Sequence, residues 1–144
     1  MDKKERAINY FGRGYNCSQA VLAVFCEELG VNEETALKIA TGFGGGMRQA
    51  EVCGAVTGAL MVIGLKYGHF VEGDIASKEK AYALTKEFQE RFKRSNNTVL
   101  CKELLEYDLS KPDDMALIKE KGLFQTICPE MIKDAVGILE EMLQ

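Results

Sequence analysis

Five cysteines, at positions 17, 26, 53, 101 and 128, are the most reactive side chains of this sequence. A thiolate can act as a nucleophile, as half of a disulfide or as a metal ligand, so several chemistries are open. No C-x-x-C pair occurs, which excludes a thioredoxin-type motif and a zinc ribbon, and no C-x-x-C-H occurs, which excludes a covalently attached c-type haem. A site shared by these cysteines must therefore be assembled by tertiary packing.

Two of the cysteines lie where capping signals open a helix. Cys17 follows Asn16, a favourable N-cap residue, and Gln19 stands where the partner of a capping box is expected. Cys128 directly precedes Pro129, whose fixed φ suits the first helical position. Both thiols are predicted at or beside a helix N-terminus, where free backbone N–H groups and the helix dipole stabilise a thiolate.

The other three cysteines are of two kinds. Cys53 and Cys101 fall in the first turns of two further predicted helices, and Thr98 is the expected cap of the second. Cys26 lies inside the helix that begins beside Cys17, among apolar residues, and is predicted to pack in the core. A buried cysteine is usually a small hydrophobe, so simple packing remains an alternative for the other four as well.

A glycine-rich loop precedes Cys53 in the segment "GFGGGMRQAEVC". Such a loop can turn its backbone N–H groups toward a thiolate or a cluster sulfur, and an arginine adds positive charge. The loop lacks the Gly-Lys-Ser/Thr ending of a P-loop and follows a helix, so a nucleotide site is not expected. A tight corner between helices is the alternative. The candidate cofactor-binding residues are Gly44, Gly45, Gly46, Arg48 and Gly54.

His69 is the only histidine, and it lies in the stretch "KYGHF". Without a second histidine or a clear acid–base pair, and without a nucleophile-elbow serine, hydrolase chemistry has no support. We expect a structural role for His69.

The 144 residues fit one domain, 1–144, of which 47% are hydrophobic and 28% charged. The net charge of −4 argues against nucleic-acid binding, which needs a clustered basic face. The longest apolar stretch, 52–65, is too short to span a bilayer. The polar N-terminus lacks an apolar signal region, so we expect a cytoplasmic protein whose cysteines do not form a permanent disulfide framework.

Helical periodicity predominates and no stretch shows sustained strand alternation. The sequence predicts an all-α fold, a compact bundle of about seven or eight helices around a central apolar helix at about 50–66. The other helices are expected at about 3–11, 16–30, 33–40, 78–94, 100–107, 112–122 and from 128 onward. Gly54 and Gly58 give the central helix a small-residue strip, which permits close approach of another helix within the domain or across a homodimer.

The segments "GYNCSQAVL", "GFGGGM" and "VCGAVTGA", with Cys101 and Cys128, resemble the C_GCAxxG_C_C family of putative redox-active proteins over essentially the whole chain. The resemblance implies that the family's four cysteines fall on Cys17, Cys53, Cys101 and Cys128, with Cys26 outside the pattern. Similar domains occur in split-Soret cytochromes, where haem and an iron–sulfur centre accompany this type of fold. An iron–sulfur centre is therefore open here.

Three functions remain compatible with the sequence. The first is a redox protein whose four cysteines converge near the glycine loop, either binding an iron–sulfur cluster or cycling between thiols and disulfides. If the cysteines cycle between thiols and disulfides, Cys53 is the expected attacking thiolate. The expected partner of a redox protein of this kind is another redox protein, or a small-molecule thiol or electron carrier. The other two are a non-enzymatic binding module with a structural zinc site held by all four cysteines, and a helical scaffold with packed thiols and no cofactor.

Overall fold

The computed structural model describes all 144 residues and confirms the all-α prediction. Its only strand-like contact is an isolated antiparallel bridge between Val52 and Leu100. The helices are α1 (Lys3–Gly12), α2 (Cys17–Cys26), α3 (Glu33–Ala40), α4 (Gly54–Tyr67), α5 (Ile75–Asn96), α6 (Cys101–Leu105), α7 (Pro112–Lys121), α8 (Leu123–Thr126) and α9 (Cys128–Met142). No helix is both long enough and apolar enough to cross a membrane.

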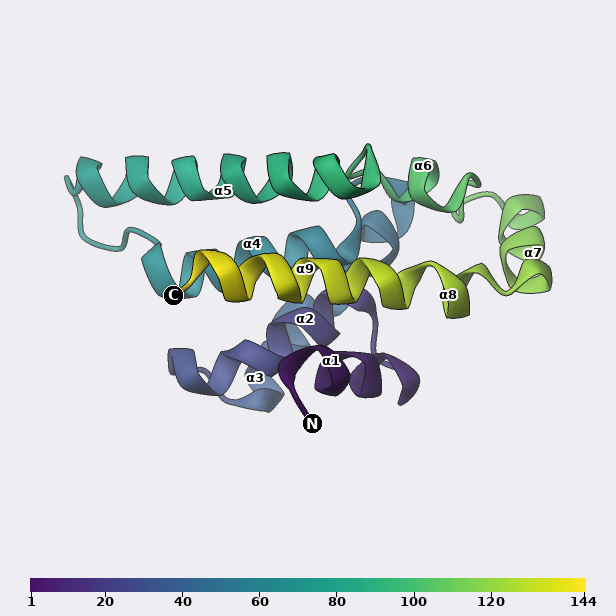
Figure 1. Cartoon of the computed structure of the whole chain (residues 1–144), viewed down its shortest axis with the longest axis horizontal. Helices are drawn as coiled ribbons and strands as arrows, with labels where there is room; N and C mark the ends of the chain where they lie inside the picture. Colours follow the sequence, from purple (N-terminus) through teal and green to yellow (C-terminus); the bar gives the residue numbers. More distant parts are fainter.

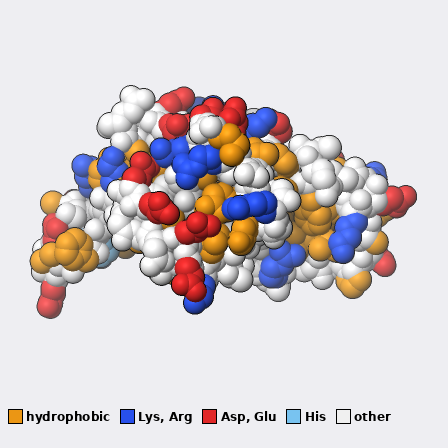
Figure 2. Space-filling model, turned by 90° about the horizontal axis from the view of Figure 1, so that it is seen from below, with side chains coloured by type: hydrophobic (Ala, Val, Ile, Leu, Met, Phe, Trp, Pro, Cys, Tyr) orange, Lys and Arg blue, Asp and Glu red, His pale blue; other side chains and the backbone are white.

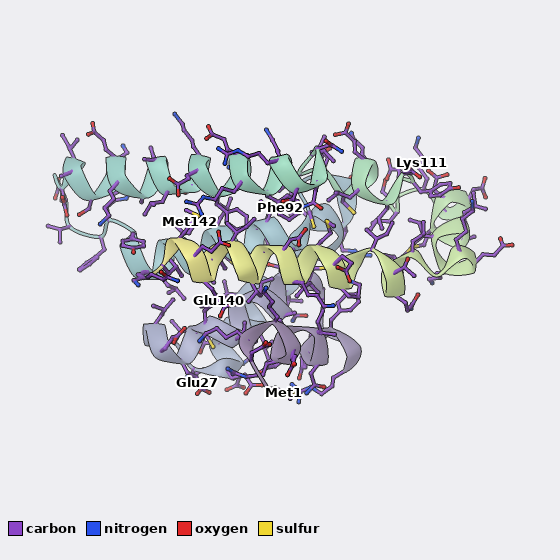
Figure 3. All side chains as sticks on the ribbon, in the orientation of Figure 1. Met1, Glu27, Phe92, Lys111, Glu140 and Met142 are labelled. Carbon is purple, nitrogen blue, oxygen red and sulfur yellow. The ribbon has the colours of Figure 1, made fainter.

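Helix α4 lies at the centre of the bundle, as predicted. It packs against α2, α5 and α9, and α2 in turn contacts α1 and α3. In Figure 1, α5 and α9 run along the long axis of the molecule, α1 to α3 lie below them, and α6 to α8 form one end. Figure 3 shows Phe92 pointing from α5 into the space beside α9, and its side chain is fully buried in the main core.

Two glycines of α4 let α2 approach closely. A Cβ atom at Gly58 would lie 2.7 Å from the carbonyl oxygen of Ser18, and one at Gly54 would lie 3.2 Å from the Cβ of Cys17. The small-residue strip therefore serves a contact within the chain. This contact brings the N-terminus of α4 against the N-terminus of α2, and so fixes Cys53 near Cys17.

The predicted start of the central helix, at about residue 50, was wrong. Helix α4 begins at Gly54, and Cys53 is its N-cap rather than a residue of its first turn. The preceding residues cannot continue a right-handed helix, because Met47, Arg48 and Ala50 have φ values of 58°, 62° and 56°.

Other boundaries agree with the capping signals more closely. The capping box of α2 is present: the backbone N–H of Gln19 donates to the Asn16 side chain, and the Gln19 side chain accepts from Asn16.

The predicted cap of α6 was wrong. This helix begins at Cys101, and its N-cap is Leu100 rather than Thr98. The Thr98 hydroxyl instead accepts a hydrogen bond from the backbone N–H of Leu100.

The buried apolar residues form two clusters of unequal size. The main core contains residues of α1 to α5 and α9, including Cys17 and Cys53. A small satellite cluster contains Cys101, Leu105 and Ile118 under α6 to α8, and the half-buried Cys128 packs against both. The four candidate cysteines thus lie where the two clusters meet.

Candidate four-cysteine site

The structure brings the four candidate cysteines together around one cavity of about 350 Å³. They come from four separate elements. Cys17, Cys101 and Cys128 are the first residues of α2, α6 and α9, and Cys53 is the N-cap of α4. All four thiols are free, and their clustering at helix N-termini agrees with the sequence prediction.

The bridge between Val52 and Leu100 sets the position of two of these thiols. The backbone N–H of Cys53 donates to the carbonyl of Val99 at 2.7 Å, and that of Cys101 donates to the carbonyl of Glu51 at 2.6 Å. The two segments therefore run antiparallel for one bridge, and each then turns into a helix. The sequence gives no sign of this bridge, because a strand of one residue pair is too short to show the alternating pattern of a β-strand.

Burial keeps two of the thiols protonated. It raises the pKa of Cys53 to about 11, against the opposing effect of hydrogen bonds from the backbone N–H groups of Ala55 and Val56. Burial also raises the pKa of Cys101 to about 12, and negative charge on Cys53 and Cys128 adds to this, while Arg48 opposes it. Both thiols are only 7% exposed, so loss of solvation outweighs the helix N-termini.

Cys17 and Cys128 behave as a pair. A hydrogen bond between the two side chains, together with burial, raises the pKa of Cys17 well above its usual value. The same hydrogen bond lowers the pKa of Cys128, which is also the least buried of the four. The proton is thus held on Cys17, and Cys128 is the thiol that ionises first. Cys128 therefore forms a thiolate more readily than Cys53, the residue for which the sequence predicted one.

The glycine-rich loop contains a turn of left-handed backbone. Gly45, Gly46, Met47 and Arg48 follow one another with φ values of 64°, 63°, 58° and 62°. For a residue with a side chain this conformation costs about 1–2 kcal/mol, so Met47 and Arg48 are strained. The turn lies between α3 and Glu51, and its Arg48 lines the cavity.

Three of the five candidate cofactor-binding residues line the cavity: Gly45, Arg48 and Gly54. The other two pack behind it. A Cβ atom at Gly44 would lie 2.4 Å from the side chain of Asn16, and one at Gly46 would lie 2.2 Å from the backbone nitrogen of Glu51. Gly44 and Gly46 therefore allow the loop to pack closely and do not contact the cavity.

The two residues that the sequence assigned to structural roles lie outside the cavity. Cys26 ends α2, is fully buried, and its thiol donates to the carbonyl of Ala23 at 3.3 Å. His69 is exposed in the turn between α4 and α5, where its ring meets that of Tyr82 edge-on. Figure 2 shows apolar side chains together with acidic ones at the left end of the molecule.

The rest of the cavity wall was not anticipated. It is mostly apolar, although Asn16 and Gln125 also line it, and it comes largely from α6, α7 and the segment around α8. Its residues include Phe11, Leu104, Leu105, Leu109, Met115 and Phe124. Helical periodicity marks such residues as core, and nothing in their spacing distinguishes a cavity wall from packed interior.

Four thiols line one cavity, and four cysteine thiolates are, in number and kind, the usual donor set of an iron–sulfur cluster. As placed, no three cysteine, histidine, aspartate or glutamate side chains surround a single metal-ion position.

Comparison with known proteins identifies the family. The model of the C_GCAxxG_C_C family, described as "Putative redox-active protein", matches residues 15–142. No curated protein and no solved structure matches the chain. The match spans nearly the whole chain and includes all four cysteines of the cavity. This chain therefore belongs to the C_GCAxxG_C_C family.

Proposed function

We propose that the chain is an electron-transfer protein in which Cys17, Cys53, Cys101 and Cys128 together hold an iron–sulfur cluster. The observation that carries this proposal is the convergence of four free thiols, from four different helix N-termini, on one cavity. Family membership supports redox chemistry in general. When bound, such a cluster would accept and release one electron at a time.

The surrounding residues are suited to stabilise negative sulfur. The backbone N–H groups of Ala55 and Val56 lower the pKa of Cys53, against the larger effect of burial. Arg48 is the only charged side chain, cysteines aside, among the residues that line the cavity. These donors would lower the energy of bound thiolates, because charge-assisted hydrogen bonds are stronger than neutral ones.

Thiol–disulfide exchange is the second candidate, and the hydrogen-bonded pair of Cys17 and Cys128 favours it. The Cys128 thiolate would attack a disulfide of the substrate, form a mixed disulfide and release one substrate thiolate. The Cys17 thiol would lose its proton and attack Cys128, which releases the second substrate thiolate. The protein would gain a Cys17–Cys128 disulfide, and the substrate would be reduced by two electrons.

Anaerobic purification tests both candidates. Iron and acid-labile sulfide are measured per chain, with visible absorption before and after dithionite, for the wild type and for each Cys→Ser variant. Cluster binding predicts that iron and sulfide fall in the variants of Cys17, Cys53, Cys101 and Cys128. Cys26→Ser is the matched control: it changes a buried cysteine of the same core and should keep its iron.

Other outcomes would change the assignment. Zinc with no spectral change on reduction would contradict the redox proposal and favour the structural metal site. Metal-free protein that forms a Cys17–Cys128 disulfide on incubation with a small disulfide would support the second candidate. Metal-free protein whose thiols react no faster than free cysteine would overturn both.

A further inference from the structure

The cavity extends beyond the sulfur atoms. Its wall of α6, α7 and α8 side chains is almost entirely apolar, as in pockets that bind small organic molecules, and about 350 Å³ falls in the size range of such pockets. Met115 and Met131, two flexible side chains, are part of this wall. The cysteines line one part of the cavity, and three of them, Cys17, Cys53 and Cys101, are only 7% exposed to solvent.

One charged group interrupts this apolar surface. Arg48 lies on the cavity wall, yet its side chain is exposed overall. It forms no ion pair: the salt bridges of the chain involve other residues. Its one side-chain hydrogen bond, from Nη1 to the carbonyl of Gly44, is long at 3.4 Å. The guanidinium therefore has donors free for a ligand.

The backbone at Arg48 has a left-handed conformation, which residues with a side chain normally avoid. Arg48 and Met47 both adopt left-handed backbone conformations, which are found where surrounding structure enforces them and concentrate at functional sites. A Cβ atom at Gly45 would lie 2.5 Å from Nη1 of Arg48, so the absence of a side chain there makes room for the guanidinium. The loop thus fixes one cation at the edge of an apolar cavity.

We propose that this cavity binds a small amphiphilic anion, with its apolar body against the wall of α6 to α8 and its anionic group on Arg48. Four reasons carry the assignment: the concave shape, the apolar wall, the single unpaired cation and the place of the cysteines on the same cavity. Electron exchange between this ligand and the cysteines would rest on the proposed function. Binding of the ligand to the cavity does not rest on it. A small molecule also suits a recess better than a protein partner does.

Anilinonaphthalene sulfonate and N-phenylnaphthylamine test the proposal, because they share an aromatic skeleton and only the first is anionic. Each is titrated by fluorescence into the as-purified protein. We expect one site for the sulfonate, and Arg48→Gln should weaken its binding about fivefold, the upper end for an exposed ion pair. Binding of the neutral probe should not change in Arg48→Gln.

Two further variants keep the test decisive. Lys102→Gln removes the same charge from α6, one residue from Cys101 but off the cavity wall, and should leave both affinities unchanged. Met115→Trp narrows the cavity and should weaken both probes. Near-UV circular dichroism reports whether each variant keeps its packed fold.

The results that overturn the proposal are distinct from failure of the redox function. Equal losses in Arg48→Gln and Lys102→Gln would show only a general charge effect. Unchanged binding in Met115→Trp would place the probes elsewhere. Binding that appears only after iron is removed would show that the cavity is merely the cofactor's own space. The first two results do not depend on whether iron is bound or the thiols are reactive, and the third compares the protein with and without iron.

Discussion

Cys53 and Cys101, 48 residues apart in sequence, are held on the same cavity by two backbone hydrogen bonds. Cys53 donates to the carbonyl of Val99 at 2.7 Å, and Cys101 donates to the carbonyl of Glu51 at 2.6 Å. Each bond uses an N–H group at the start of a helix, where the helix itself supplies no acceptor. Backbone hydrogen bonds therefore hold Cys53 and Cys101 near each other. Their placement depends on the conformation of the glycine-rich loop, because this loop positions Glu51.

Gly46→Ala tests this dependence. A Cβ atom there would lie 2.2 Å from the backbone nitrogen of Glu51, so the substitution must displace the segment that pairs with Cys101. We expect the free energy of unfolding to fall by at least about 3 kcal/mol, from the clash together with the left-handed φ of 63°. Chemical denaturation measures it.

Gly73→Ala is the matched control for that variant. Gly73 also has a left-handed φ, 85°, but a Cβ atom there would meet nothing within 4 Å. Gly73→Ala should lower the free energy of unfolding by only about 1–2 kcal/mol, which is the cost of the left-handed backbone conformation without a clash. Equal losses in the two variants would show that the contact with Glu51 is unimportant.

Two glycines of α4 offer a second comparison. Gly58→Ala would place a Cβ atom 2.7 Å from the carbonyl oxygen of Ser18, so α2 and α4 must separate, and we expect a loss of about 1–3 kcal/mol. Gly64→Ala, on the same helix, meets nothing within 4 Å and should stabilise the protein by about 0.5–1 kcal/mol. Thermal unfolding of both variants measures the difference. If both raise the melting temperature, the close packing of α2 on α4 is not required.

Much of this architecture could be predicted because it depends on local signals. Asn16 and Gln19 specify the start of α2, and Pro129 marks the start of α9, so the placement of Cys17 and Cys128 at helix N-termini followed from a few neighbouring residues. The apolar character of residues 52–65 likewise identified the central helix.

The remaining features depend on distant contacts. Nothing in the residue types of Met47 and Arg48 favours left-handed backbone, so the true start of α4 could not be predicted. A bridge of one residue pair leaves no periodic pattern, and the order in which the thiols ionise depends on which sulfurs meet. The glycine-rich loop and the helix N-terminus favour a thiolate at Cys53, but burial, which the sequence does not show, raises its pKa to about 11.

The raised pKa of Cys53 predicts a loss of stability at alkaline pH in the reduced, metal-free protein. Between about pH 9 and pH 11 the unfolded chain releases this proton while the folded protein retains it, because burial raises the folded pKa to about 11. The stability that Cys53 contributes is thus complete below its pKa in the unfolded chain. It is lost as the pH rises through its pKa in the folded protein. The loss can reach about 2–3 kcal/mol.

Cys53→Ser isolates that contribution, because a serine does not titrate in this range and is a good N-cap residue. Urea denaturation of wild type and variant at pH 8 and at pH 10.5 gives two differences in the free energy of unfolding. We expect the wild type to lose more stability than the variant between the two pH values. Parallel losses would show that Cys53 ionises as easily in the folded protein as in the unfolded chain.

The lowered pKa of Cys128 predicts its reactivity. In the reduced, metal-free protein, iodoacetamide at pH 8 should alkylate Cys128 before the other thiols, since Cys17, Cys53 and Cys101 all have raised pKa values. Mass spectrometry of timed samples identifies the order. Cys17→Ala removes the hydrogen bond that stabilises the Cys128 thiolate, so its midpoint of reactivity should move to higher pH and its rate at pH 8 should fall about tenfold.

Cys26→Ala provides the comparison, because Cys26 is buried in α2 with its thiol bonded to the carbonyl of Ala23, outside the cavity. That variant should leave the rate at Cys128 unchanged. If Cys17→Ala and Cys26→Ala slow alkylation equally, general loosening of the core explains the effect. If neither slows it, the Cys128 thiolate owes its stability to the N-terminus of α9, because the backbone N–H of Cys128 is then the remaining donor.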